Sequence, residues 1–240
     1  MNLPAEQPVL SPRQKYILIA GIALAMILPA LFSRLLLLVH LDNVGLLVAS
    51  RFIYWSIAGL LCLYAIKVER QPFILWHQYQ PVEFYLKWAV LLYLLCLAAS
   101  IISAIPNLFH MKDDMTIMYK WIRIIVNKYW LLLFCAVTAG ITEELICRAY
   151  IVPRLQQLFK NNYLPVLLSA AIFSALHYRY FSLRETIFTF LIGVIFAVHY
   201  QRYKNIHVLI LVHFMVDFFS FLLARYAVTH HLDKFALGIW

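Results

Sequence analysis

The stretch of sequence that decides the fold is YWLLLFCAVTAGITEELICRAYIV, residues 129–152. It opens with 14 uncharged residues, after which Glu143, Glu144 and Arg148 stand in the middle of an otherwise apolar run. A charged side chain near the centre of a bilayer costs about 2.5–3.5 kcal/mol, so it usually pairs, faces a wet cavity or serves a function. The stretch therefore predicts a membrane-embedded helix that carries a polar site.

The composition of the whole chain agrees with a membrane protein. Of 240 residues, 64% are hydrophobic and 13% are charged, and the mean hydropathy of +0.81 lies well outside the range of soluble domains. The net charge is +9, but the 20 Lys and Arg residues are scattered through short connections. We therefore expect the lipid bilayer as partner and no nucleic acid. The cysteines all lie inside apolar runs, which indicates core thiols and neither disulfides nor zinc ligands: Cys62, Cys96, Cys135 and Cys147.

The apolar runs predict an all-α fold, a polytopic transmembrane helix bundle of seven or eight spans. The seven runs are 16–39, 44–66, 84–105, 129 to beyond 154, 163–178, 184–200 and 206–226. The connector 108–128 mixes charged and apolar residues, which predicts an amphipathic surface segment, or an eighth span if it enters the bilayer. We divide the chain into a disordered polar tail 1–14, N-terminal helices and connector 15–128, the helices of the polar site 129–226 in a single membrane domain, and a C-terminal tail 227–240.

The charged stretch has a definite geometry if it is helical. Glu144 and Arg148 are four residues apart and share a face, whereas Glu143 points about 100° away from Glu144. This predicts that Glu144 pairs with Arg148 and leaves Glu143 as the uncommitted acid. A purely structural ion-pair network is the alternative.

Two later runs bring further ionisable residues to the same depth. His177 ends one run, and Glu143 and His177 are each 17 positions from the polar turn at Lys160. In an antiparallel helical hairpin this places the two side chains at the same height. Counting from the next polar turn on that side, Arg202-Tyr203-Lys204, places His213 at a similar depth.

Six ionisable side chains are thereby predicted to lie within reach of one another. They are Glu143, Glu144, Arg148, His177, His213 and Asp217. Burying them unpaired would cost on the order of 10 kcal/mol, comparable to the whole stability of a domain. The occurrence of all six residues within reach of one another therefore indicates a functional site.

The ordered motifs resemble a known family. Glu143-Glu144-x-x-x-Arg148, Phe173-x-x-x-His177 and His213-x-x-x-Asp217, on successive predicted helices, are similar to the motifs of the CPBP (CAAX protease and bacteriocin-processing, ABI) family, which includes Rce1-type endopeptidases. The resemblance covers residues 143–217. It implies a glutamic-type intramembrane protease that cleaves a peptide bond in a peptide or in a prenylated or otherwise lipidated protein.

The resemblance also implies roles for the individual residues. Glu143 and His177 would activate a water molecule, and His213 and Asp217 would support the oxyanion. Glu144, Arg148 and Phe173 would be structural or orienting residues. The family pattern most often has Asn where this chain has Asp217. An ionised Asp cannot donate a hydrogen bond, so Asp217 is either protonated or orients His213, and we favour the orienting role.

Other interpretations stay open at this point. Amide hydrolysis needs a base and donors aimed at the oxyanion, which these residues supply without a cofactor, but Glu143, His177 and His213 could also bind zinc. A proton-coupled transporter or a bacteriocin-immunity protein would also bury such residues. Arg34 and Arg51 are attributed to snorkelling or interhelical pairing. The compact length is similar to that of prokaryotic family members, which favours the prokaryotic plasma membrane.

Overall fold

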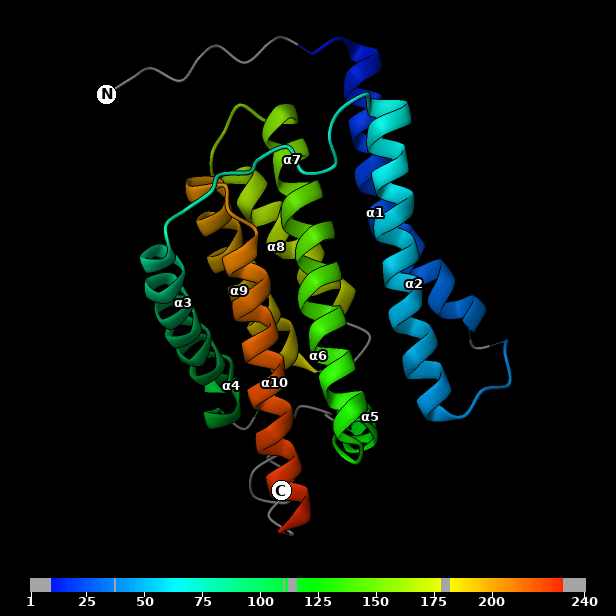
Figure 1. Cartoon of the computed structure of the whole chain (residues 1–240), viewed down its shortest axis with the longest axis vertical. Helices are drawn as coiled ribbons and strands as arrows, with labels where there is room; N and C mark the ends of the chain where they lie inside the picture. The colour runs from blue at the N-terminus through cyan, green and yellow to red at the C-terminus, as the bar shows by residue number, and fades with distance from the viewer. Residues whose placement is uncertain (1–9, 37, 110, 112–115, 178–181, 231–240) are drawn as a thin grey trace.

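The protein is a bundle of α-helices, as predicted. The computed structural model describes residues 10–36, 38–109, 111, 116–177 and 182–230, and no strand occurs in these ranges. The helices (Figure 1) are α1 Pro12–Leu36, α2 Asn43–Tyr64 with the π-helical turn η1 Ala65–Glu69, α3 Val82–Ser103, α4 Ile105–Leu108, α5 Thr116–Val126, α6 Tyr129–Glu144, the π-helical segment η2 Leu145–Ile151, α7 Val152–Leu158, α8 Leu164–His177, α9 Leu183–Tyr203 and α10 His207–Thr229.

The expectation of seven or eight membrane spans is wrong, because the described residues contain six helical segments long and apolar enough to cross a bilayer. These are Pro12–Leu36, Asn43–Glu69, Val82–Leu108, Tyr129–Leu158, Leu183–Tyr203 and His207–Thr229. The predicted span at 163–178 corresponds to α8, whose 14 residues reach about 21 Å, short of the ~30 Å hydrocarbon core. The connector forms α5, an amphipathic helix of only 11 residues, and is not an eighth span.

The charged stretch lies inside one long helical segment formed by α6, η2 and α7, as expected from its flanks. The regular α-helix ends at Glu144, and the next seven residues, Leu145–Ile151, form the π-helical segment. Such segments widen the turn and often occur at functional sites. Here the change of winding begins directly after Glu143 and Glu144.

Two glycines let the helices of the site approach closely. A Cβ atom at Gly140 of α6 would lie 3.0 Å from the backbone nitrogen of Phe214 on α10. A Cβ atom at Gly193 of α9 would lie 2.8 Å from Cα of Ala170 on α8. The absence of side chains at these positions brings the backbones of α6 and α10, and of α8 and α9, into contact.

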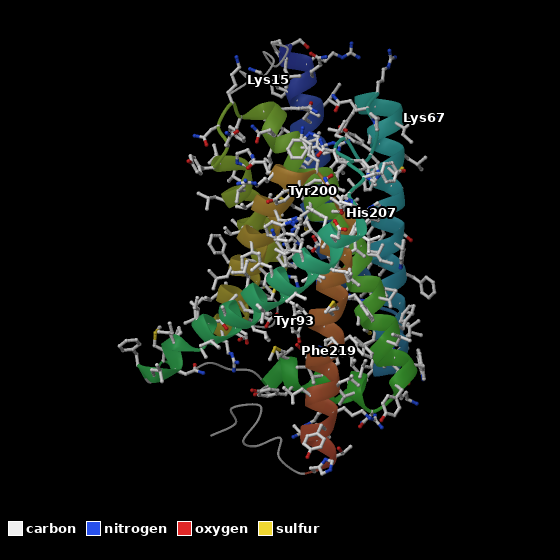
Figure 2. All side chains as sticks on the ribbon, turned by 60° about the vertical axis from the view of Figure 1, so that its left-hand side comes forward. Lys15, Lys67, Tyr93, Tyr200, His207 and Phe219 are labelled. Carbon is white, nitrogen blue, oxygen red and sulfur yellow. The ribbon has the colours of Figure 1, made fainter. Side chains whose placement is uncertain are left out.

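The N-terminal helices pack around this centre. In Figure 1, α1 and α2 run side by side and α2 lies against α6, whereas α3 lies on the far side of α9 and α10. Figure 2 shows Lys15 and Lys67 at one end of the molecule, and Tyr93 of α3 beside Phe219 of α10 with ring centroids 5.9 Å apart. The four cysteines are free thiols, as predicted.

A buried ion pair attaches the segment between α2 and α3 to α7. Arg154 and Glu69 lie 2.9 Å apart (Nη2 to Oε2), and both side chains are completely buried. Arg154 also donates hydrogen bonds to the carbonyl oxygens of Pro72 and Phe73, and the hydroxyl of Tyr150 donates to Glu69 Oε1 at 2.6 Å. We call Glu69, Tyr150 and Arg154 the α2–α7 latch.

Candidate active site

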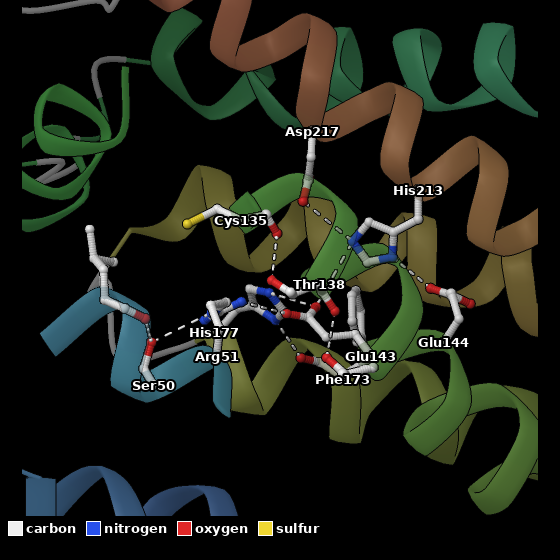
Figure 3. Close-up of polar contacts among 12 residues, drawn as sticks. Ser50, Arg51, Cys135, Thr138, Glu143, Glu144, Phe173, His177, His213 and Asp217 are labelled. Carbon is white, nitrogen blue, oxygen red and sulfur yellow. Dashed lines mark hydrogen bonds and ion pairs between the residues drawn. The ribbon is translucent and has the colours of Figure 1, made fainter. Parts of the chain in front are cut away.

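Three helices bring the predicted acid and both histidines together, as Figure 3 shows. Glu143 comes from α6, His177 from α8 and His213 from α10. Oε2 of Glu143 lies 3.7 Å from Nε2 of His177 and 3.9 Å from Nε2 of His213. The predicted equal depth of the three side chains is therefore confirmed.

The ring of His177 is oriented by its own helix. Nδ1 of His177 lies 2.9 Å from the carbonyl oxygen of Phe173, one turn earlier. Because a carbonyl oxygen can only accept, Nδ1 carries the proton in this contact. The neutral ring therefore presents the lone pair of Nε2 to Glu143. The ring of Phe173 also packs against the imidazole, with centroids 4.7 Å apart.

Glu144 forms a completely buried connection between two partners. Its Oε1 accepts from Nη1 of Arg148 at 2.7 Å, which confirms the predicted pairing, and it also lies 2.7 Å from Nδ1 of His213. The guanidinium of Arg148 lies over the rings of Phe173, at 4.2 Å, and Phe196, at 5.3 Å from the centroid. The side chains of Glu144 and Arg148 are both completely buried. Through Glu144 this pair holds the ring of His213 at its Nδ1 atom.

Asp217 forms an ion-pair contact with His213, and its orienting role stays a prediction. Its Oδ2 lies 3.8 Å from Nε2 of His213, too far for a hydrogen bond, and its side chain is 26% exposed. Glu144 holds the other ring nitrogen, Nδ1. Asp217 lies beside Nε2, on the side of the ring that faces Glu143.

The site opens into a cavity of about 420 Å³. Its polar end contains Glu143, His177, His213 and Asp217. Apolar side chains from α2, α5, α9 and α10 line much of its wall: Leu46, Leu47, Met118, Trp121, Ile122, Phe188, Val216 and Phe221. Further polar residues line it as well: Ser33, Ser50, Arg51, Ser100, Ser103, Arg184, Glu185 and Ser220. The volume falls within the ~300–1,000 Å³ of sites for small molecules and peptide segments.

Sequence reasoning missed one residue of the site. Nη1 of Arg51, on α2, lies 3.7 Å from Oε1 of Glu143, and Arg51 also lines the cavity. The sequence around Arg51 is that of an isolated cation near the start of an apolar run, which is typical of snorkelling. Only the packing of α2 against α6 reveals its partner.

The alternative in which Glu143, His177 and His213 bind zinc stays a prediction. In the part of the chain that the structure describes, no group of three His, Cys, Asp or Glu side chains is arranged to hold a metal ion. Nδ1 of both histidines is engaged by protein oxygen atoms and both Nε2 atoms face Glu143, an arrangement that metal-ligating histidines also adopt. Metal-free chemistry stays a prediction, which chelation can test.

Comparison with known proteins places the site inside a family region. Residues 125–219 match the model of the family described as "Type II CAAX prenyl endopeptidase Rce1-like". No curated protein and no solved structure matches the chain. The matched region contains every residue of the three motifs, so the resemblance is confirmed where the candidate site lies. Residues 125–219 of this multi-pass integral membrane protein are thus similar to the Rce1-like type II CAAX prenyl endopeptidases.

Proposed function

We propose that this protein is a glutamic-type endopeptidase that cleaves a peptide bond of a prenylated or otherwise lipidated protein within the membrane. The observation that carries the proposal is the position of Glu143 Oε2, 3.7 Å from Nε2 of His177 and 3.9 Å from Nε2 of His213. These separations are too long for direct hydrogen bonds and suit a water molecule that bridges the groups.

Glu143 and His177 are the pair that activates this water. The carboxylate oxygen and the lone pair of Nε2 each accept one of its two protons, which leaves an oxygen lone pair directed away from both groups. The water oxygen attacks the carbonyl carbon as its proton passes to Glu143. When the carbon–nitrogen bond then breaks, Glu143 returns that proton to the leaving amine nitrogen.

His213 stabilises the oxyanion as an imidazolium. Its Nδ1 proton is directed at Glu144 Oε1, 2.7 Å away, so a second proton on Nε2 is needed before this nitrogen can donate to the substrate. The carboxylates of Glu144 and Asp217 lie on the two sides of the ring and favour the charged form. This gives Asp217 an electrostatic role that does not require it to donate a hydrogen bond.

The cavity suits a substrate with a polar and an apolar part. The peptide bond to be cleaved must reach the acid and the histidines at the polar end, and the apolar walls from α2 and α5 can hold a lipid chain. Burying one methylene group contributes about 0.8 kcal/mol, so even part of an isoprenoid chain would anchor the substrate.

The proposal is tested by cleavage in reconstituted vesicles. A farnesylated peptide with a CAAX-type C-terminus is incubated with the protein, and the products are identified by mass spectrometry. We expect removal of the C-terminal residues, and a loss of roughly 100- to 10,000-fold in kcat for Glu143→Gln and for His177→Ala. Wild-type turnover by a folded Glu143→Gln protein would overturn the proposal.

A further inference from the structure

We infer that Arg51, on α2, is a positioning residue that holds the carboxylate of Glu143 in its reactive orientation. The inference rests on the proposed role of Glu143 as the base. Arg51 lies outside the region 125–219 that matches the family model, so it adds a contribution from the N-terminal helices to the site.

The two oxygen atoms of Glu143 face different groups. Oε1 lies 3.7 Å from Nη1 of Arg51, whereas Oε2 lies 3.7 and 3.9 Å from the imidazoles of His177 and His213. A free carboxylate can rotate about its last carbon–carbon bond and exchange its oxygens. A guanidinium next to Oε1 opposes this rotation and leaves Oε2 directed at the histidines.

Arg51 is itself held on α2. Its Nε donates to the hydroxyl of Ser50 at 3.5 Å, and that hydroxyl donates to the carbonyl oxygen of Leu47 at 2.7 Å. The guanidinium also lies 5.0 Å from the ring centroid of Tyr54, one turn further along the helix. Figure 3 shows the side chain directed at Glu143. With 17% side-chain exposure, Arg51 extends into the bundle and not towards a lipid head group.

The charges nearest Glu143 favour a cation at this position, and Arg184 and Glu185 also line the cavity. The site holds the carboxylates of Glu143, Glu144 and Asp217, and the guanidinium of Arg148 is bonded to Glu144 in a completely buried pair. Glu143 lies on the cavity side of that pair, where Arg51 supplies its counter-charge. Positive charge there favours the ionised carboxylate that base catalysis needs.

The test is the kinetics of Arg51→Ala and Arg51→Lys with the farnesylated peptide. Misplacement of a reacting group by ~1 Å can cost 100-fold, so we expect kcat of Arg51→Ala to fall roughly 10- to 100-fold. KM should change little, because Arg51 acts through Glu143. Arg51→Lys should retain more activity than Arg51→Ala, and added guanidinium ion should partly restore Arg51→Ala. Arg34→Ala is the matched control, because Arg34 lies on α1 with an exposed side chain and does not line the cavity.

The outcomes separate this inference from the proposed function. If Arg51→Ala keeps wild-type kcat while Glu143→Gln is inactive, the inference is wrong and the protease proposal stands. A rise in KM at unchanged kcat would also overturn the inference, because it would assign Arg51 to substrate binding. If Arg51→Ala does not fold, the comparison is made with Arg51→Gln and Arg51→Lys, and equal losses in both variants contradict a role of the charge. Activity in Glu143→Gln would overturn the proposed function, and the inference with it.

Discussion

Nδ1 of His213 donates a hydrogen bond of 2.7 Å to Oε1 of Glu144, which lies 69 positions earlier in the chain. This contact joins α10 to α6 in the interior of the bundle and directs Nε2 of His213 at the cavity. Because the same oxygen accepts from Arg148, the orientation of the histidine depends on an ion pair that has no contact with the cavity. These contacts support the proposal that the second glutamate of the motif is a structural residue that orients His213.

Glu144→Gln should destabilise the protein strongly, because it leaves the guanidinium of Arg148 buried without its counter-charge. Removing one partner of a buried pair costs about 3–5 kcal/mol, and replacing both by uncharged groups is often neutral. The double variant Glu144→Gln/Arg148→Met should therefore regain much of the stability in thermal unfolding, while its activity stays low because His213 has lost its orienting carboxylate. Recovery of full activity in the double variant would contradict the role that we give to Glu144.

Asp217→Asn should remain active, in contrast to Asp217→Leu. An Asn side chain at this position lacks the charge that favours the imidazolium of His213, but it can replace this effect by donating a hydrogen bond to the oxyanion, as in the usual family pattern. Leu can neither donate nor carry charge. Losing one oxyanion-stabilising group typically costs about 100- to 1,000-fold in kcat, and we expect this loss for Asp217→Leu only. Equal inactivity of the two variants would show that the negative charge of Asp217 is essential.

The α2–α7 latch should contribute to stability and not to catalysis. Glu69→Gln removes the charge that pairs with the buried Arg154, at an expected cost of about 3–5 kcal/mol. None of the three latch residues lines the catalytic cavity, so turnover per folded protein should not change. The two quantities are measured by thermal unfolding and by turnover corrected for the folded fraction. Tyr150→Phe, which removes one hydrogen bond and no charge, is the milder control.

Much of the site could be predicted from the sequence because it depends on helical spacing and depth. The pairing of Glu144 with Arg148 follows from their separation of four residues, and the equal depth of Glu143 and His177 follows from their equal distance from one turn. The contact of Glu144 with His213 depends on the rotation of α10 about its axis, which spacing along one helix does not define.

Two other differences between the sequence-based predictions and the structure, at α8 and at Arg51, also have physical causes. Apolarity alone did not separate α8 from a membrane span, because a short helix partly buried among its neighbours is as apolar as one that crosses the bilayer. The sequence left Arg51 open between snorkelling and interhelical pairing, because its sequence neighbourhood is the same whether it reaches water or a carboxylate. The packing of α2 on α6 brings Arg51 to the carboxylate of Glu143. This packing is a tertiary contact, which the residues next to Arg51 in the sequence do not define.

Chelation should leave activity unchanged. The proposed chemistry uses a carboxylate, an imidazole and an imidazolium, so treatment of the purified protein with 1,10-phenanthroline should not reduce peptide cleavage. Loss of activity that is restored by added Zn²⁺ would favour the alternative in which Glu143, His177 and His213 bind a metal ion.

The central claim, that Glu143 and His177 act on one water molecule, is tested most directly by a double-mutant cycle. Turnover of the farnesylated peptide is measured for Glu143→Gln, for His177→Gln and for the double variant, each shown to be folded. If the two side chains act as a unit, the double variant should lie within about threefold of the less active single variant. Losses that multiply in the double variant, or a single variant with wild-type turnover, would contradict the claim.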